Sequence, residues 1–148
     1  MTIILREVSG DNWRQVARLK LAEGQEKFVA PNWYSMLEAI FSNGELHSRA
    51  IYHDDTLIGY TMFGIDGATQ ACWIVRLMTA QEHQGKGYGR TAMAQIIDLL
   101  KQMYTCKEIF ISFEPENNVA RKLYESIGFQ DTGRIEDNEL VFRLAVEG

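Results

Sequence analysis

Residues 81–103, QEHQGKGYGRTAMAQIIDLLKQM, decide how the rest of the chain is interpreted. The segment contains three glycines within five residues: Gly85, Gly87 and Gly89. Apolar side chains at helical spacing follow at once, so the sequence predicts a helix that begins at this loop. Glycine lets a ligand approach the backbone, and the first N–H groups of a helix have no internal partners. With the cations Lys86 and Arg90 beside them, these features predict a site for phosphate or pyrophosphate.

The glycine-rich segment differs from the two commonest phosphate-binding loops. It lacks the GKS or GKT of a P-loop, and it lacks the G-x-G-x-x-G spacing with a later ribose-binding acid. Cations in a first helical turn are unfavourable for an isolated helix, and their placement is reasonable where an anion binds. A strand-to-helix turn without a ligand is the alternative interpretation of this segment taken alone.

Length and composition predict a single domain over residues 1–148, and the expected order of strands and helices makes it a mixed α/β chain. Apolar residues make up 46% of the chain and charged residues 24%, close to a globular average. The net charge of −5 argues against a nucleic-acid partner, which calls for a basic face. No apolar run is long enough to cross a bilayer, and the first residues lack signal-peptide features. We therefore expect no membrane partner and a cytoplasmic location.

Hydrophobic periodicity and turn residues predict the order strand, helix, helix, three strands, helix, strand, helix, strand. Strands are expected at residues 2–8, 71–79, 108–113 and 139–146, with a hairpin at 48–64 that turns at Asp54 and Asp55. Helices are expected after the N-caps Asp11 and Asn32, from the glycine loop to about Tyr104, and at 117–129 with Gly128 as the stop. The strands at 71–79 and 108–113 flank one helix, so they should be parallel.

The two cysteines, Cys72 and Cys106, have no metal-ligand spacing, and we expect both to stay reduced. Cys72 lies in an apolar strand-like run and is interpreted as a small core residue. Three scattered histidines form no recognisable zinc motif. The sequence therefore predicts no metal site.

Arg76 places a charge inside the otherwise apolar strand at 71–79. Strict alternation puts Cys72, Ile74, Arg76 and Met78 on one face of that strand. If Arg76 is buried there, it requires a carboxylate partner. An arginine that reaches the rim of the sheet needs none, and this second arrangement is the favoured expectation.

Two motifs resemble those of the GNAT (Gcn5-related) N-acetyltransferases. Gln84, Gly87 and Gly89 match the Q/R-x-x-G-x-G/A pattern of that family. The segment ENNVARKLYESIGF at residues 116–129 is similar to its second signature, through Asn117, Ala120, Leu123, Tyr124, Gly128 and Phe129. The resemblance implies the GNAT fold, a mixed central sheet of about six to seven strands with about four helices, and acetyl-coenzyme A as the cofactor.

The resemblance also assigns the cofactor-binding residues. The strand end would pair its backbone with the pantetheine arm, as an added strand pairs with a sheet edge. The loop would bind the pyrophosphate through backbone N–H groups, and Asn117 and Tyr124 would contact the coenzyme arm. The strand-end and loop residues are Leu77, Met78, Thr79, Gln84, Gly85, Lys86, Gly87, Tyr88, Gly89 and Arg90. Asn117 is also a candidate N-cap of the helix that follows, and both roles are compatible.

Tyr124 matches the family tyrosine that protonates the coenzyme A sulfur, and a phenol with a pKa of about 10 remains a donor at neutral pH. The alternative is a half-buried helix residue without a chemical role. For the base, Glu114 and Glu116 stand just after the strand at 108–113, where the ligand should lie. We take Glu114 as the candidate; Glu82 beside the loop and proton transfer through water are alternatives.

The segment LAEGQEKFVAPNWYSMLEAIF at residues 21–41 adds a resemblance to the bacterial spermine/spermidine (diamine) acetyltransferases of the family. It implies a small-molecule amine substrate that meets Glu26, Trp33, Glu38 and Glu116 through charge and cation–π contacts. For each acid the alternative is a solvated helix face, and for Trp33 it is the core. A protein N-terminus, an aminoglycoside and a non-catalytic coenzyme-binding role remain alternatives, and relatives imply a homodimer.

Overall fold

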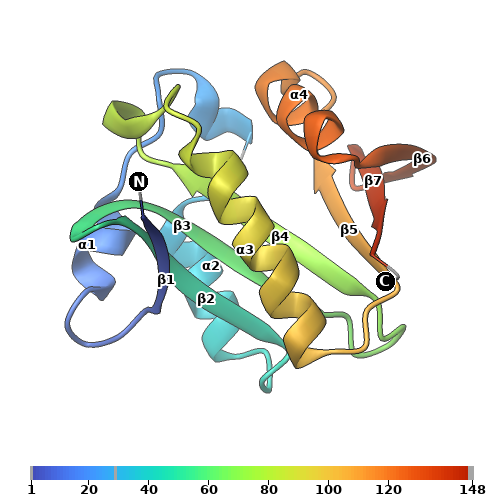
Figure 1. Cartoon of the computed structure of the whole chain (residues 1–148), viewed down its shortest axis with the longest axis horizontal. Coiled ribbons are helices and arrows are strands. Elements are labelled where there is room, and N and C mark those ends of the chain that lie inside the picture. Colours follow the sequence, from blue (N-terminus) through green and yellow to red (C-terminus); the bar gives the residue numbers. More distant parts are fainter. Residues whose placement is uncertain (1, 29, 147–148) are drawn as a thin grey trace.

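The computed structural model describes residues 2–28 and 30–146. Its strands form one seven-stranded sheet in the order β1-β2-β3-β4-β5-β7-β6 (Figure 1). The strands are β1 (Ile3–Glu7), β2 (Leu46–His53), β3 (Thr56–Ile65), β4 (Cys72–Thr79), β5 (Glu108–Phe113), β6 (Gln130–Glu136) and β7 (Glu139–Ala145). The helices are α1 (Trp13–Arg18), α2 (Asn32–Ile40), α3 (Tyr88–Met103) and α4 (Asn118–Ile127), with short 3₁₀ turns η1 (Gln25–Phe28) and η2 (Gln81–His83).

The strands β4 and β5 form the parallel pair of the sheet, and α3 connects them as predicted. Their paired residues end at Ile74 and Ile111, so the remaining halves of the two strands diverge. The other neighbouring strands are antiparallel. This divergence opens the centre of the sheet toward the carboxyl end of β4, where the glycine loop begins.

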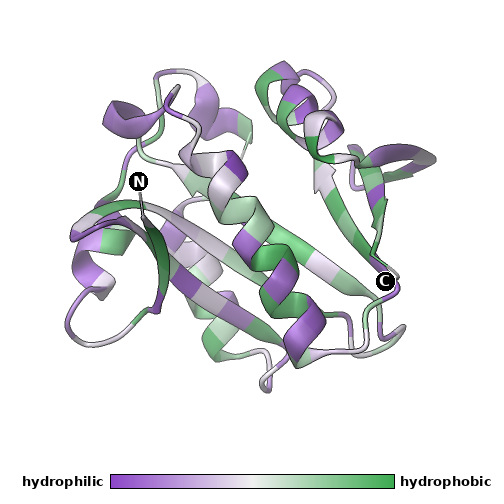
Figure 2. Ribbon diagram, viewed as in Figure 1, coloured by the Kyte–Doolittle hydropathy of each residue, from purple (hydrophilic) through white to green (hydrophobic). Residues whose placement is uncertain are grey.

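Helices cover both faces of the sheet. Met93 and Ile96 of α3 pack in one buried cluster with residues of β4 and β5. Val16 of α1 and Met36 of α2 pack in a second cluster with residues of β3 and β4. Figure 1 places α3 in front of the sheet and α2 behind it, and Figure 2 shows apolar residues along the central strands between them. Burial of these apolar side chains is the main stabilising contribution.

The expected element order omitted β6, so the sheet has seven strands where the order predicted six. Nearly all of β6 is exposed, and its sequence QDTGRIE has no alternating apolar pattern. The strand forms because it pairs with β7 across a turn in which Asp137 and Asn138 adopt positive φ angles. Edge strands of this kind carry little hydrophobic signal, because neither face is buried.

The N-caps predicted for the first two helices, Asp11 and Asn32, are both wrong. The first helix follows Asn12, whose side-chain oxygen accepts a hydrogen bond from the Ser9 N–H at 2.8 Å instead of capping the helix. The second helix begins at Asn32 with Pro31 in the N-cap position. The Asn32 side chain is buried because it makes tertiary hydrogen bonds rather than a local cap. The predicted stop at Gly128 is confirmed, with a φ of 117° in the left-handed region.

A β-bulge at Val75 changes the face to which the second half of β4 points. Consecutive residues of β3 pair with Ile74 and Arg76, so Val75 is the extra residue on β4. Cys72 and Ile74 therefore pack in the cluster with α3, whereas Met78 packs in the cluster with α1 and α2. The predicted common face for these residues is wrong, because an inserted residue shifts strict alternation by one.

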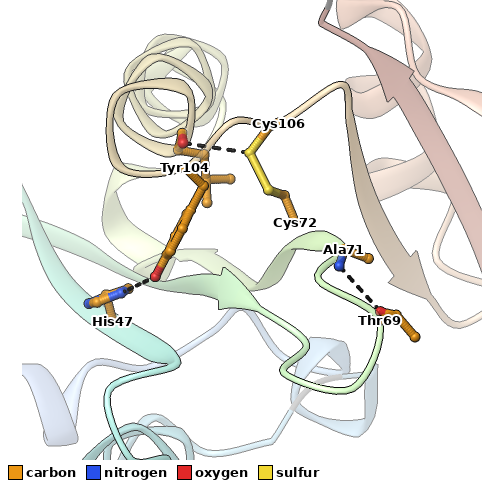
Figure 3. The surroundings of a disulfide bond; sticks show 7 residues. His47, Thr69, Ala71, Cys72, Tyr104 and Cys106 are labelled. Carbon is orange, nitrogen blue, oxygen red and sulfur yellow. Dashed lines mark hydrogen bonds between the residues drawn. A yellow bond between two sulfur atoms is a disulfide. The ribbon is translucent and has the colours of Figure 1, made fainter.

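Cys72 and Cys106 form a disulfide, so the expectation that both stay reduced is wrong (Figure 3). The two residues are 34 positions apart, and their spacing carries no local signal. The parallel pairing of β4 with β5 brings them together, since Cys72 pairs with Ile109 just beyond Cys106. Their Cα atoms lie 6.2 Å apart, within the usual range for disulfides. The bond ties the start of β4 to the segment between α3 and β5.

Candidate active site

A cavity of about 800 Å³ occupies the space where β4 and β5 diverge. Residues of both strands, of α4 and of the glycine loop line one part of it, and residues of η1 and α2 line another. The cavity therefore joins the predicted cofactor site to the region that was expected to hold the acceptor. A concave site of this size is sufficient for a small ligand.

The glycine loop adopts the backbone conformation that glycine makes possible. Gly85 and Gly87 have φ angles of 78° and 82°, in the left-handed region that a side chain would strain. Gly87 is the N-cap of α3 and supplies no capping side chain, so within the part of the chain that the structure describes the start of this 16-residue helix has no side-chain cap. These N–H groups and the positive end of the helix dipole lie at the cavity and fit a pyrophosphate.

The structure brings nearly all of the predicted cofactor residues to this cavity. Those that line it are Leu77, Met78, Thr79, Gln84, Gly85, Gly87, Tyr88, Gly89, Arg90, Asn117 and Tyr124. Lys86 is the predicted cofactor residue that is absent from the lining. Among the described residues the β4–β5 ladder ends at Ile74, so the β5-facing edge of β4 beyond that residue can pair with an extended arm.

Two of these side chains also have structural partners within the protein. The Gln84 side-chain amide donates to the Thr79 carbonyl oxygen at 2.8 Å and to Gln25 Oε1 at 2.9 Å, which braces the loop against the end of β4. Asn117 Oδ1 accepts the Ala120 N–H at 3.2 Å, so Asn117 is the N-cap of α4 while it lines the cavity.

Tyr124 is buried on α4 and reaches the cavity. Its ring packs edge-on against Phe113 of β5, with ring centroids 5.4 Å apart. Burial raises the pKa of Tyr124 to about 12; the charge of Arg76 acts in the lowering direction and Glu139 in the raising direction. The phenol is therefore protonated at neutral pH and is available as a proton donor.

The predicted acidic and aromatic acceptor residues divide into two groups. Glu114 and Glu38 line the cavity, whereas Glu26, Glu116 and Trp33 are absent from its lining. Trp33 is 54% exposed, so it is neither a core residue nor a wall of the cavity.

A third cavity carboxylate, Glu139 at the start of β7, was not among the residues predicted from the sequence. Its Oε1 accepts a hydrogen bond from the Ser112 hydroxyl at 2.8 Å. The pairing of β5 with β7 brings it there, and no local sequence signal indicates that pairing.

Arg76 is buried, with 6% of its surface exposed, and lines the cavity. Its Nη2 donates to Asn32 Oδ1 at 2.8 Å, and among the described residues its Nε and Nη1 have no hydrogen-bond partner. Burial lowers the pKa of Arg76 to about 10, which leaves it charged at neutral pH. The expected position at the sheet rim is wrong, because the bulge at Val75 turns this side chain toward α2.

Among the described residues, no helix is long and apolar enough to cross a bilayer. Within the same residues, no three His, Cys, Asp or Glu side chains are grouped as metal ligands.

A family model described as the acetyltransferase (GNAT) family matches residues 13–129. The chain therefore belongs to this family, and the glycine loop, the diverging strands and the buried tyrosine are in accord with it. It is an N-acetyltransferase that uses acetyl-coenzyme A, as the two motifs implied.

Three proteins of known name are similar to this chain in sequence or in fold. The spermine/spermidine N(1)-acetyltransferase of Bacillus subtilis (strain 168) is 26% identical over 147 residues, covering 93% of this chain and 94% of its own. A spermidine N-acetyltransferase from Vibrio cholerae, in complex with CoA and spermine, has a TM-score of 0.75 at 20% identity, covering 97% of this chain and 94% of that chain. A ribosomal L7/L12 alpha-N-protein acetyltransferase (RimL), in complex with coenzyme A, has a TM-score of 0.81 at 12% identity, covering 99% and 95%.

Proposed function

We propose that this enzyme transfers the acetyl group from acetyl-coenzyme A to a primary amine of a polyamine by direct attack on the thioester. The observation that carries the transfer step is the placement of Tyr124, a buried and protonated phenol in the cavity that the glycine loop also lines. A donor in this position suits a leaving thiolate, which must gain a proton as it departs.

The chemical balance is simple. The neutral amine nitrogen forms a bond to the acetyl carbon while the carbonyl π electrons move onto oxygen. When the C=O bond re-forms, the C–S bond breaks, its electrons go to sulfur, and Tyr124 gives sulfur its proton. The nitrogen then loses its extra proton, and Tyr124 recovers one through water or through a carboxylate. Glu114 is the candidate base, because it lines the same cavity.

The cofactor residues have complementary roles in this proposal. The N–H groups at the start of α3 bind the pyrophosphate, Gly85 and Gly87 keep that backbone open, and Arg90 adds charge. The free edge of β4 at Leu77–Thr79 pairs with the pantetheine arm, which aims the thioester toward the point where β4 and β5 separate. Lys86 contributes only long-range charge, because it lies outside the cavity lining.

A polyamine acceptor is supported by the Bacillus subtilis relative and by the spermine that accompanies the Vibrio cholerae structure. It is also supported by three carboxylates in the cavity, Glu38, Glu114 and Glu139, which offer partners for the ammonium groups of a polycation. Glu26, Glu116 and Trp33 lie outside the cavity lining, so in this proposal they contact at most the distal part of a long substrate.

A protein α-amine is the second candidate acceptor, supported by the fold similarity to the alpha-N-protein acetyltransferase. The test is the release of free coenzyme A thiol from acetyl-coenzyme A with spermine, spermidine, putrescine, an aminoglycoside, a short peptide or buffer alone. Release with spermine or spermidine is the expected result. Release with the peptide or the drug alone would overturn the polyamine assignment, and release with none of them would favour a non-catalytic coenzyme-binding role.

The assembly we propose is a homodimer that forms through the outer face of α2. That face carries large apolar side chains that are about half exposed or more: Trp33, Tyr34, Leu37, Ile40 and Phe41. Monomeric proteins rarely expose such a contiguous group. Sedimentation of the wild type as a dimer and of Ile40→Glu as a monomer would support this assembly, and a monomeric wild type would refute it.

The proposed cytoplasmic location has one observation against it. The Cys72–Cys106 disulfide is more typical of oxidising compartments. Fractionation of the source cells, followed by immunodetection of the chain, tests the location. Recovery in the cytoplasmic fraction is the expected result, and recovery outside it would overturn the location.

A further inference from the structure

Among the described residues, Arg76 carries the buried side-chain nitrogens that lack a hydrogen-bond partner, and it lines the cavity. Nη2 donates to Asn32, but Nε and Nη1 have no partner among the described residues, and Arg76 as a whole is 6% exposed. A buried cation whose donors are unpaired is unfavourable unless something completes its hydrogen bonds. Because Arg76 lines the cavity, a ligand that enters the cavity can supply the missing acceptor.

The position of Arg76 indicates which part of the ligand it meets. β4 and β5 are last paired at Ile74 and Ile111, and Arg76 stands two residues beyond, where the strands have separated. Tyr124 lines the same cavity, and the charge of Arg76 influences the pKa of its hydroxyl. Tyr124 is the proposed acid for the coenzyme sulfur, so a cation that lines the same cavity would also act on a thioester held there.

We propose that Arg76 stabilises the negative charge that develops on the acetyl oxygen and on the coenzyme sulfur during transfer. This role rests on the direct-attack function proposed above. Arg76 exchanges no proton in it. Its free N–H groups donate hydrogen bonds to the oxygen when the π electrons move there, and its charge stabilises the sulfur when the C–S bond breaks. Such fixed donors in a water-poor site are among the strongest contributions to catalysis.

Asn32 explains how the charge of Arg76 is kept available. Its side-chain NH₂ donates to the Val16 carbonyl oxygen at 2.9 Å, which fixes the amide with its oxygen toward Arg76. A neutral amide oxygen positions the guanidinium and leaves its positive charge intact. A carboxylate in the same place would neutralise that charge. Asn32 is therefore a positioning residue, and Asn32→Asp should weaken the effect of Arg76 while preserving the contact.

The first test needs no turnover. The thiol of coenzyme A bound to the protein is titrated by its thiolate absorbance, with protein alone as the blank. Both cysteines are in the disulfide, so the oxidised protein adds no thiolate of its own. In the wild type we expect a bound-thiol pKa lower by roughly one unit or more than in Arg76→Gln, because a nearby cation favours the thiolate. Equal values in the two proteins would overturn the proposal even if no acceptor were known.

Arg49→Gln is the matched control. Arg49 is also an arginine of the sheet, although it is only partly buried; its Nη1 donates to the Ser48 carbonyl oxygen, and it is absent from the cavity lining. This variant should titrate like the wild type. Thermal unfolding of each variant checks the fold, and Arg76→Lys keeps the charge if Arg76→Gln does not fold.

Kinetics provide the second test. Arg76→Gln should lower kcat by on the order of 100-fold while the Kd for acetyl-coenzyme A stays within a few-fold, and Asn32→Asp should lower kcat more than Asn32→Ser. A raised acceptor KM with unchanged kcat would overturn the proposal, because Arg76 would then bind the acceptor. A failure of the proposed transfer function gives a different pair of results from a failure of the Arg76 proposal. In that case Tyr124→Phe would be fully active, although Arg76→Gln would still shift the thiol pKa.

Discussion

The side-chain amide of Gln84 donates a hydrogen bond to the Thr79 carbonyl oxygen at 2.8 Å, and so ties the glycine loop to the end of β4. A second bond from the same amide reaches Gln25 Oε1 at 2.9 Å. The glutamine of the loop motif thus braces the site through protein contacts. The loop and the strand edge are proposed to hold different parts of one coenzyme, and Gln84 sets the distance between them.

Gln84→Ala should therefore weaken acetyl-coenzyme A binding by several-fold while it costs only about 1 kcal/mol of folding stability. Calorimetric titration with acetyl-coenzyme A and denaturant unfolding measure the two effects. Gln70→Ala is the control, because Gln70 Nε2 donates to the Gly67 carbonyl oxygen at 3.0 Å in an exposed turn. Equal coenzyme affinities for Gln84→Ala and the wild type would show that the brace has no part in binding.

The variants Gly87→Ala and Gly89→Ala distinguish the effect of backbone conformation on coenzyme binding from the effect of the space available to a side chain. Gly87 has a φ of 82°, which an alanine adopts only with strain, whereas a Cβ at Gly89 would meet Leu123 Cδ2 at 3.6 Å and Thr79 Oγ1 at 3.8 Å, ordinary contacts. Gly87→Ala should weaken acetyl-coenzyme A binding by about ten-fold, from roughly 1 kcal/mol or more of strain, and Gly89→Ala should remain near the wild type. Similar affinities for both variants would contradict the conformational explanation.

The dependence of kcat on pH follows from the raised pKa of Tyr124. Turnover should rise as the bound amine loses its proton, and it should then stay level, because Tyr124 with a pKa of about 12 keeps its proton throughout the usual assay range. Stopped assays with constant ionic strength measure the profile. A descending limb centred near the ordinary tyrosine value of 10.0, absent from Tyr124→Phe, would contradict the assigned burial effect.

The Cys72–Cys106 disulfide should leave no free thiol in the denatured, unreduced protein. It closes a segment with a sequence separation of 34, so the double variant Cys72→Ala/Cys106→Ala should lose about 4 kcal/mol of stability in the loop-entropy model. Unfolding with and without reductant measures the loss, and the double variant should be insensitive to reductant. Titration of two thiols in the unreduced wild type would contradict the bond.

Local patterns in the sequence predicted much of this fold. The glycine loop, the parallel strands around α3 and the left-handed cap at Gly128 each depend on residues that are close in sequence. The two coenzyme motifs converge on one cavity for the same reason, since each follows a strand that ends there.

The features that the sequence did not predict depend on non-local pairing. The Cys72–Cys106 bond requires the β4–β5 register, and Glu139 enters the cavity only through the pairing of β5 with β7. The burial of Arg76 depends on Val75, the extra residue on β4 opposite β3. The pattern of apolar residues in the sequence of β4 does not indicate that a bulge occurs there. Trp33 points outward although its size favours the core, because Asn32 takes the inward position on α2.

The most direct test of the central claim compares wild type and Tyr124→Phe in release of coenzyme A thiol from acetyl-coenzyme A with spermidine as acceptor. The phenylalanine keeps the ring that packs against Phe113 and removes only the hydroxyl. We predict that kcat falls by about 100-fold while the Kd for acetyl-coenzyme A is unchanged, because the proton donor alone is lost. Unchanged turnover in Tyr124→Phe would contradict the assignment of Tyr124 as the acid and, with it, the transfer mechanism proposed for this enzyme.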